Sequence, residues 1–404
     1  MPSRKSNNIT LPFGSETELK KHLENSLTES LKQLIRVTVN TVVKEEMTRY
    51  RSEMQEVLGK VYFNGSYGRD LVAPMGMIKD VPIPRFRTNV PGWEPPSLGI
   101  FPEQQEQFMH LVGEMHRVGV SQRKVAKLAK ECFGVKLSAN RVGFVHRELA
   151  QREEAQINTR PLEDIYEYLY LDGLWVKAKG YGWESNKAVL LCVLGVTPTG
   201  KREIVGFTVA HAEDYDSWHD LLLNLKHRGL TGANLKLSVS DGAEGLLKAL
   251  AQLFPNLPHQ SCIIHKMRNV LSSTSHTHKA EVAEGLKKIY NSDDEKGALL
   301  ASQEFCKKWY LSEPKAIEIL KHNLQATWTY FNFERKEWHK IRTNNVLERE
   351  FREVRRRINV FDSSFNDTDS LTRYAGSTFS YLNQNYPRSR GGLHTNAVLP
   401  HVKM

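Results

Sequence analysis

Leucines spaced three or four positions apart open the chain, and this spacing is typical of one face of an amphipathic helix. The repeat predicts helix from residue 16 to about residue 58, as one helix or two, after a polar start that we expect to be loose. Such a face favours packing against a core or pairing with a second copy of the chain. We assign residues 1–60 to a helical N-terminal region.

Two short extended runs on either side of a Pro-Met-Gly turn predict a β-hairpin over residues 67–87. Pro82 and Pro84 place its second strand at a sheet edge, because proline has no amide proton to donate to a neighbouring strand. Prolines are dense between positions 91 and 102, which indicates a linker. We assign residues 61–102 to the hairpin and linker.

Residues 103–157 show the periodicity of three helices separated by glycine-containing breaks. Ser121 and Ser138 stand where helix N-caps favour serine. Helix, short glycine turn, helix is the order of a helix-turn-helix DNA-binding domain, with an ordinary three-helix bundle as the alternative. Basic or titratable side chains lie on or near the third helix: Arg141, His146, Arg147 and Arg152.

From residue 168 onward the pattern changes to strands and helices. Apolar runs predict strands at 168–176, 188–196, 203–209 and 235–241, helices at 216–228 and 245–254, and a short strand within 259–264. The second run is almost continuously apolar, as expected of a strand buried on both faces. Three strands in a meander, then a fourth beyond a helix, are compatible with a ribonuclease-H-like core.

The remainder of the chain is predominantly helical. Residues 266–340 are mostly helical by pattern, and a final helix is predicted from about residue 345 to residue 360. Beyond residue 386 the chain is rich in glycine, arginine and serine, and we expect it to be disordered.

The net charge of +10 and the pI of about 9.2 suit a polyanionic partner such as DNA, although a merely basic protein is the alternative. The four cysteines are scattered and form no disulfide framework. The first residues lack the apolar segment of a signal peptide, and no stretch is long and apolar enough to span a membrane. We therefore expect a cytoplasmic protein.

Three acidic residues stand out by position. Asp172 lies inside an apolar strand, where a carboxylate is costly unless it is paired or bound to metal. Asp241 ends the fourth strand before a glycine, where an ordinary turn aspartate is the alternative. Glu348 lies in the first turns of the last predicted helix, beside its buried stripe, and a solvated glutamate favoured by the helix dipole is the alternative.

Carboxylates of this kind, if they meet, suit metal-dependent phosphoryl transfer. Two divalent ions can activate an oxygen nucleophile and stabilise a departing oxyanion, and hard ions such as Mg²⁺ take oxygen ligands. We expect Asp172, Asp241 and Glu348 to hold two Mg²⁺ or Mn²⁺ ions. Asp172 is the candidate for the bridging ligand, because a central strand is the most rigid mount.

Several segments, in order, resemble the Mutator-type transposases of bacterial insertion sequences, and the resemblance spans nearly the whole chain. The matching segments are residues 64–69 with 81–87, 160–177, 217–246, 254–270 and 343–349. The most distinctive of them contains Gln260-Ser261-Cys262-Ile263-Ile264-His265.

The resemblance implies a DNA transposase with a ribonuclease-H-like catalytic core of residues 158–265 and 341–385. It makes Asp172, Asp241 and Glu348 the catalytic and metal-binding triad, with Glu350 and Glu353 as fallback candidates for the third position. The long separation between the second and third members corresponds to the family's all-helical insertion, here residues 266–340, and residues 386–404 form the disordered tail.

Cys262 and His265 form a Cys-x-x-His pattern that, with His276 and His278 downstream, is one arrangement for zinc. A single cysteine argues against zinc. The resemblance favours active-site support instead, with His265 hydrogen-bonded near the catalytic metals or the DNA backbone.

Five arginines follow the glutamate between positions 349 and 357. Arginine pairs bidentately with phosphate, so Arg349 and Arg356 are the first candidates for DNA contact here, alongside Arg141 and Arg147 of the helix-turn-helix. A solvated helix face is the alternative.

These expectations combine into one hypothesis: metal-dependent cleavage at transposon ends, then transfer of the freed 3′-hydroxyl into target DNA. The helix-turn-helix and hairpin would bind terminal inverted repeats, and joining two ends requires at least a homodimer. Two alternatives stay open. One is a domesticated sequence-specific DNA-binding protein without catalysis, and the other is a nuclease of the same fold that never joins strands. The residues leave the cut-and-paste and circle-forming routes undecided, although the resemblance favours the circle.

Overall fold

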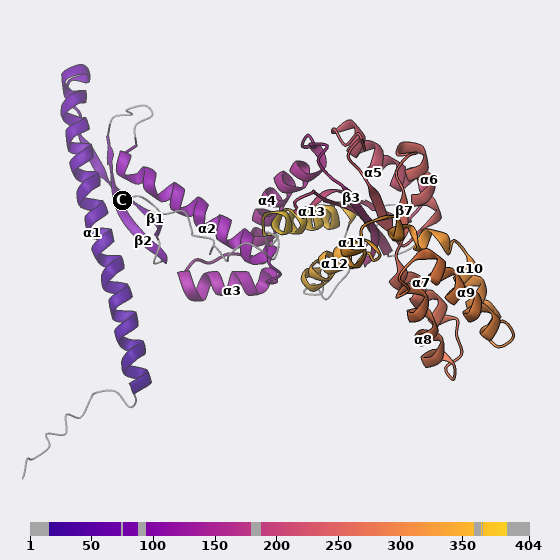
Figure 1. The fold of residues 1–404 in the computed structure, drawn as a ribbon. Coiled ribbons are helices and arrows are strands. Elements are labelled where there is room, and N and C mark those ends of the chain that lie inside the picture. Colours follow the sequence, from indigo (N-terminus) through magenta and orange to yellow (C-terminus); the bar gives the residue numbers. More distant parts are fainter. Residues whose placement is uncertain are drawn as a thin grey trace, which may run out of the picture. The chain divides into compact units, whose positions relative to one another are not determined.

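The computed structural model describes residues 16–73, 76–87, 94–178, 187–358, 365 and 367–385 (Figure 1). The chain divides into two compact units, each described here by itself. The first comprises Met1–His116 and Val120–His146, and the second comprises Arg117–Gly119 and Arg147–Met404. Helix α4 (Ala139–Thr159) begins in the first unit and continues in the second.

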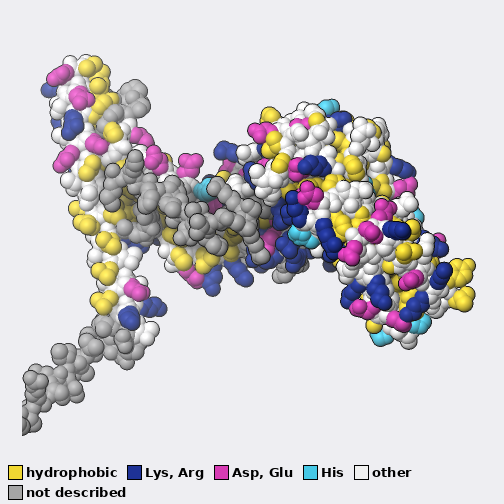
Figure 2. All heavy atoms as spheres, in the orientation of Figure 1, with side chains coloured by type: hydrophobic (Ala, Val, Ile, Leu, Met, Phe, Trp, Pro, Cys, Tyr) yellow, Lys and Arg dark blue, Asp and Glu magenta, His cyan; other side chains and the backbone are white. Residues whose placement is uncertain are grey.

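A single long helix, α1 (Glu16–Leu58), opens the described part of the first unit, so the predicted N-terminal repeat forms one helix rather than two. Its second half packs through Val43 and Met47 into a small core with the hairpin. In its first half, the side chains of Leu23, Leu27, Leu31 and Leu34 are exposed, Leu27 to 64%. Figure 2 shows this apolar surface along α1, and it means that the hydrophobic repeat is only partly used within the described chain.

The predicted hairpin is present as β1 (Phe63–Ala73) and β2 (Gly76–Phe86), which pair in antiparallel fashion. Within the described residues this sheet has two strands, so Pro82 and Pro84 of β2 interrupt no central ladder there. The first two residues of the predicted turn lie outside the described residues. The predicted linker ends earlier than expected: a short helix η1 (Pro96–Gly99) leads directly into α2 (Ile100–Arg117).

Three helices follow the hairpin as predicted: α2, α3 (Gln122–Phe133) and α4. Ser138 caps α4 by accepting the Arg141 N–H at 3.1 Å, whereas Ser121, at the N-cap of α3, makes no capping bond with its side chain. Buried apolar side chains join the helices: Phe108, Val112, Val125, Ala129, Val135 and Val142. His146 lies on the third helix as predicted, and its side chain is buried edge-on against His116.

The second unit is built on a mixed sheet of five strands in the order β5-β4-β3-β6-β7. Their bounds are β3 (Tyr168–Lys177), β4 (Lys187–Val196), β5 (Arg202–Ala210), β6 (Leu237–Ser240) and β7 (His259–Ser261). The first three pair in antiparallel fashion, and β6 and β7 continue the sheet in parallel with β3. These strands lie where the hydrophobic pattern predicts them, and a multidomain α/β protein is confirmed.

Helices cover both faces of this sheet, and strand alternation decides which residue faces which layer. On β3, Leu169 and Leu171 pack in the cluster that contains α5 (Tyr215–His227) and α6 (Glu244–Leu253). Tyr170 and Leu174 pack in the cluster that contains α12 (Asn345–Ile358) and α13 (Thr368–Asn385). Asp172 lies between Tyr170 and Leu174 on the same face of the strand, so its side chain points toward α12.

A helical segment separates β7 from α12, as the pattern of residues 266–340 predicts. It contains α7 (Ile263–Ser272), α8 (Lys279–Tyr290), α9 (Glu295–Trp309), α10 (Pro314–Lys321), η2 (Gln325–Thr327), η3 (Thr329–Asn332) and α11 (Arg335–Ile341). No helix among the described residues is long and apolar enough to cross a membrane.

The expectation that α12 is the final helix is wrong, because α13 follows it. The buried face of α13 is composed largely of Ala375, Gly376, Ser377 and Phe379 rather than of repeated aliphatic side chains, so it lacks the signal used elsewhere. The predicted disordered tail lies outside the described residues.

Candidate active site

Asp172 occupies the middle of the central strand, directly opposite Cys192 of β4. Its side chain is buried, with 9% of its surface exposed, and its carboxylate accepts the Gly173 N–H at 2.9 Å. Burial, and then the negative charge of Asp241, raise the pKa of Asp172 to about 8, with smaller contributions from Glu213 and Glu348. Asp172 is thus a buried carboxyl group that faces other carboxyl groups.

Asp241 follows β6 directly and is exposed. The parallel register pairs Tyr170 with Val239, and Asp172 and Asp241 each lie two residues farther along their strands. The adjacent strands therefore bring the two aspartates side by side, at the point where β6 ends. Asp241 also accepts the Ala243 N–H at 3.0 Å, as an ordinary turn aspartate does. This turn geometry does not prevent Asp241 from lying close to Asp172.

Glu348 comes to the same place from the first turn of α12. Leu347, Phe351 and Val354 of this helix are buried against the sheet, which turns the neighbouring Glu348 side chain toward the aspartates. Its side chain is 32% exposed and lies 3.4 Å from His265 Nε2. The contribution of Glu348 to the raised pKa of Asp172 places all three predicted residues in one electrostatic environment.

The two fallback glutamates lie in different surroundings. Glu350 is buried, and its charge helps raise the pKa of Cys192, after burial and Asp172. Glu353 accepts hydrogen bonds from Arg356 at 2.8 Å and from Arg357 at 2.7 Å, which occupy its carboxylate. Glu348 is among the main groups that raise the pKa of Asp172, so it has the stronger case for the third position.

A fourth carboxylate, Glu213, joins the cluster and was not anticipated from the sequence. A Cβ atom at Gly173 would lie 3.0 Å from Glu213 Oε2, so this carboxylate packs against the backbone next to Asp172. Burial and the charge of Asp241 raise the pKa of Glu213 to about 7. The nearby Trp218 indole opposes the rise, although its N–H and Glu213 Oε1 both lack a hydrogen bond of standard geometry.

One signal in the sequence was available for Glu213. It follows β5, and two antiparallel pairings bring the end of β5 to the same edge of the sheet as the end of β3. An acidic residue just beyond the end of β5 is therefore a candidate member of the carboxylate cluster. The sequence shows this only once the pairing order of β3, β4 and β5 is known.

Cys262 and His265 lie at the start of α7, close to the start of α12. The Cys262 thiol accepts the Asn344 N–H at 3.2 Å, and His265 faces Glu348. Burial raises the pKa of the Cys262 thiol above its ordinary value, so the sulfur stays protonated and neutral. His278, a possible zinc partner, is instead bound to Glu313 at 2.7 Å.

The predicted DNA-contacting arginines are distributed over two helices. Arg349 is exposed beside Glu348, and Arg356 is 69% exposed but hydrogen-bonded to Glu353. Arg141 is exposed, with its guanidinium over the Phe144 ring, and Arg147 is also exposed. Figure 2 shows Lys and Arg side chains gathered over the region where α12 lies in Figure 1.

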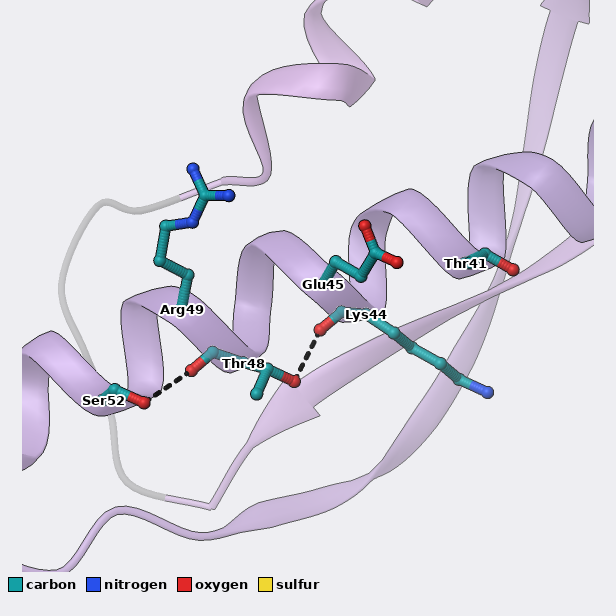
Figure 3. Close-up of a pocket in the computed structure, with 6 residues that line it drawn as sticks. All are labelled: Thr41, Lys44, Glu45, Thr48, Arg49 and Ser52. Atoms are coloured by element: carbon teal, nitrogen blue, oxygen red, sulfur yellow. Dashed lines mark hydrogen bonds between the residues drawn. The ribbon is translucent and has the colours of Figure 1, made fainter.

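Two hollows lie outside the carboxylate cluster. One, of about 650 Å³, is formed by α7 and the start of α8, with Ile264, Met267 and Leu271 in its apolar wall and Arg268 at its rim. The other, of about 470 Å³, lies on α1 (Figure 3). All six of its lining residues come from that one helix, and the hydroxyls of Thr48 and Ser52 are bound to backbone carbonyls.

Within the described residues, no three His, Cys, Asp or Glu side chains converge closely enough to enclose an ion. The carboxylates of the cluster therefore influence one another's pKa but are not arranged as a ready-made ion-binding set.

The fold and the site define a multidomain α/β protein. Its partly buried carboxylate cluster lies beside the central strand of a mixed sheet. A family described as "Transposase, Mutator family" matches residues 11–389. The chain belongs to the Mutator family of transposases, which confirms the resemblance seen in the sequence.

Individual relatives are named as transposases of bacterial insertion sequences. The transposase for insertion sequence element ISRM5 of Rhizobium meliloti (strain 1021) is 28% identical over 383 residues, covering 92% of this chain and 93% of the relative. The transposase for IS256 in transposon Tn4001 of Staphylococcus aureus is 26% identical over 380 residues, covering 91% and 94%. The transposase for IS6120 of Mycolicibacterium smegmatis is 33% identical over 195 residues, covering 48% and 59%.

Proposed function

We propose that this chain is a DNA transposase that cleaves transposon ends and transfers the freed 3′-hydroxyl into target DNA, with Asp172, Asp241 and Glu348 as its catalytic carboxylates. The main support for the proposal is that these carboxylates come close together from three separate segments of the chain. The charges of Asp241 and Glu348 both contribute to the raised pKa of Asp172. Family membership supports the reaction class.

The strand order supports a ribonuclease-H-like core. Three antiparallel strands followed by two parallel ones, with helices on both faces, match the architecture expected from the sequence. The segment from α7 to α11 then corresponds to the helical insertion, because it lies between β7, the last strand of the sheet, and the helix carrying Glu348.

The donor set fits Mg²⁺ or Mn²⁺. Carboxylate oxygens are the ligands such hard ions prefer, and Mg²⁺ usually keeps several waters and shares phosphate oxygens instead of filling an all-protein cage. Burial, and then the charge of Asp241, raise the pKa values of both Asp172 and Glu213, and a bound cation would stabilise their charged forms.

Asp172, Asp241 and Glu348 would hold two such ions, with Asp172 as the shared ligand. The ions, when bound, would lower the pKa of a nucleophilic water or hydroxyl and stabilise the departing oxyanion. The protein positions the carboxylates on adjacent strands and a packed helix, which limits their movement. His265, 3.4 Å from Glu348, restrains that side chain, and Arg268 lies at 4.0 Å on the same carboxylate oxygen.

DNA recognition is proposed for the helix-turn-helix formed by α2, α3 and α4. Exposed cations lie on α3 as well as on the predicted third helix: Arg123, Lys124, Lys127 and Lys130 on α3, and Arg141 on α4. Such a face suits phosphate contacts along terminal inverted repeats. Arg147, also on α4, is proposed to contact DNA with the helix-turn-helix, and Arg349 and Arg356 of α12 are proposed to contact DNA near the cleavage site. Joining two ends implies at least a homodimer on DNA.

Strand transfer with DNA carrying the element's own ends tests the proposal. Asp172→Ala and Glu348→Ala should lose activity at least a thousandfold, while Asp220→Ala, whose side chain is 84% exposed on α5, should retain it. Full activity in either triad variant would overturn the mechanism. Metal-independent DNA binding without any cleavage would favour a regulator, and nicks that are never joined would favour a nuclease.

A further inference from the structure

One continuous set of hydrogen bonds connects the backbone beside all three candidate catalytic carboxylates. The Cys262 N–H donates to the carbonyl of Ser240, the residue before Asp241, at 2.7 Å. The Cys262 thiol in turn accepts the Asn344 N–H at 3.2 Å. These two bonds join the end of β6 to the residue that precedes α12.

Asn344 completes the connection in two directions. Its Nδ2 donates to the carbonyl of Leu171, the residue before Asp172, at 3.0 Å. Its own carbonyl accepts the Glu348 N–H at 3.1 Å, which is the first helical bond of α12. The Asn344 side chain is fully buried, so these bonds are shielded from competing water.

The side chain of Asn344 does not act as an ordinary helix cap. A capping asparagine offers its side-chain oxygen to an N–H of the first turn. Here Oδ1 has no hydrogen-bond partner among the described residues, although it is buried. The amide is instead turned so that Nδ2 reaches β3, which identifies the bond to Leu171 as the interaction that fixes its orientation.

This connection matters because the third carboxylate has no sheet neighbour to hold it. Asp172 and Asp241 lie on paired strands, whereas Glu348 reaches them only through the docking of α12. Carboxylates that share cations must be held within a fraction of an ångström. The bond from Asn344 to Leu171 attaches the start of α12 directly to the strand of Asp172.

We propose that Asn344 and Cys262 form a positioning pair that fixes the start of α12, which carries Glu348, against the strands of Asp172 and Asp241. This inference rests on the proposed function for the identity of the bound ions. Cys262 then has a purely structural role, as a neutral thiol that accepts an amide proton, with no zinc and no nucleophilic step. Neither residue touches the reacting atoms.

Asn344→Ser separates positioning from capping. Serine caps helices as well as asparagine does, but it is too short to reach the Leu171 carbonyl. The adjacent Asn345→Ser is the matched control, because Asn345 is exposed and begins the same helix. A second pair, Cys262→Ala and Cys262→Ser, removes the sulfur acceptor or replaces it with a shorter oxygen acceptor.

Mn²⁺ titration of the DNA-free full chain, followed by electron paramagnetic resonance of the free ion, is the main readout. We expect Asn344→Ser and Cys262→Ala to weaken Mn²⁺ binding at least tenfold at a temperature where thermal scans show each variant folded. Cys262→Ser should recover part of the affinity, and Asn345→Ser should equal the parent. Parent-like Mn²⁺ affinity in Asn344→Ser would overturn the proposal.

Amide hydrogen exchange without metal distinguishes this inference from the proposed function. Asn344→Ser should speed exchange in the first turn of α12 and at Cys262, and Asn345→Ser should not. If Asp172→Asn removes no Mn²⁺ binding from the parent chain, the proposed metal chemistry is wrong. Hydrogen exchange alone then tests whether Asn344 and Cys262 act as a positioning pair. Unchanged exchange in Asn344→Ser would refute the pair even if the metal chemistry is correct.

Discussion

The two faces of the five-stranded sheet are built from the same strands and have opposite characters. The face covered by α5 and α6 is mostly apolar, with Trp218 and Leu222 among its fully buried side chains, and Glu213 lies at its margin. The face covered by α12 and α13 contains buried polar groups, including Asp172, Asn344 and Arg357. Apolar burial stabilises the first face, whereas the second accepts the cost of buried carboxylates where the chemistry is proposed to occur.

Asp172→Asn gives the largest contrast between activity and stability. Strand transfer should fall at least a thousandfold, while metal-free stability should rise at alkaline pH. The native pKa of about 8 lies above the ordinary value of 3.8, so the stability that the protonated carboxyl provides is lost as pH rises from about 4 to about 8. The asparagine variant escapes this loss.

Urea unfolding in EDTA at several pH values measures the effect. The variant and the parent should be equally stable near pH 4, and the variant should be more stable by up to about 6 kcal/mol above pH 8, because each unit of pKa shift corresponds to about 1.4 kcal/mol. A variant that is less stable than the parent at pH 9 would contradict the raised pKa.

Leu222→Ala tests the opposite face. Leu222 is fully buried between α5 and the sheet, so truncation should cost about 3 kcal/mol through lost burial and a cavity. Strand transfer per folded molecule should remain near that of the parent, because no carboxylate depends on this side chain. A large loss of activity in fully folded protein would show that the two faces are not independent.

Glu213→Gln sharpens the comparison at the boundary of the cluster. Removing this charge should lower the pKa of Asp172, because Glu213 is one of the groups that raise it. Carbon-detected NMR of labelled aspartate can follow the titration, which should move toward acid relative to the parent. Asp220→Asn, on the exposed side of α5, is the control and should leave the titration where it is.

The smallest effect is expected on the outer side of α12. Arg349→Gln should reduce the salt dependence of DNA binding by about one unit of log–log slope, as the loss of one phosphate contact does. Arg356→Gln should change it less, because Arg356 already pairs with Glu353. Binding titrations over a range of salt concentrations compare the two, and equal slopes would show that this pairing does not restrain Arg356.

Local patterns were sufficient for much of the fold. Strand alternation and helical spacing predicted the hairpin, the three helices after it, the strands of the sheet and the position of Asp172 within an apolar strand. These signals are local, since a strand or helix buries a face that recurs every two or every three to four residues. The small, mixed residues on the buried face of α13 produce no such repeat, and that helix was not predicted.

The sequence by itself determined that Asp172 needs a partner, because a carboxylate in that strand is costly alone. It could not determine which groups come to meet it. Glu213 reaches the cluster only because antiparallel pairing brings the end of β5 to the same side as the end of β3. Glu348, which the family resemblance singled out, meets Asp172 only through the docking of α12. The bond from Asn344 to Leu171 likewise joins residues far apart in the chain. Such contacts depend on how elements pack, and packing leaves no periodic signal in either segment alone.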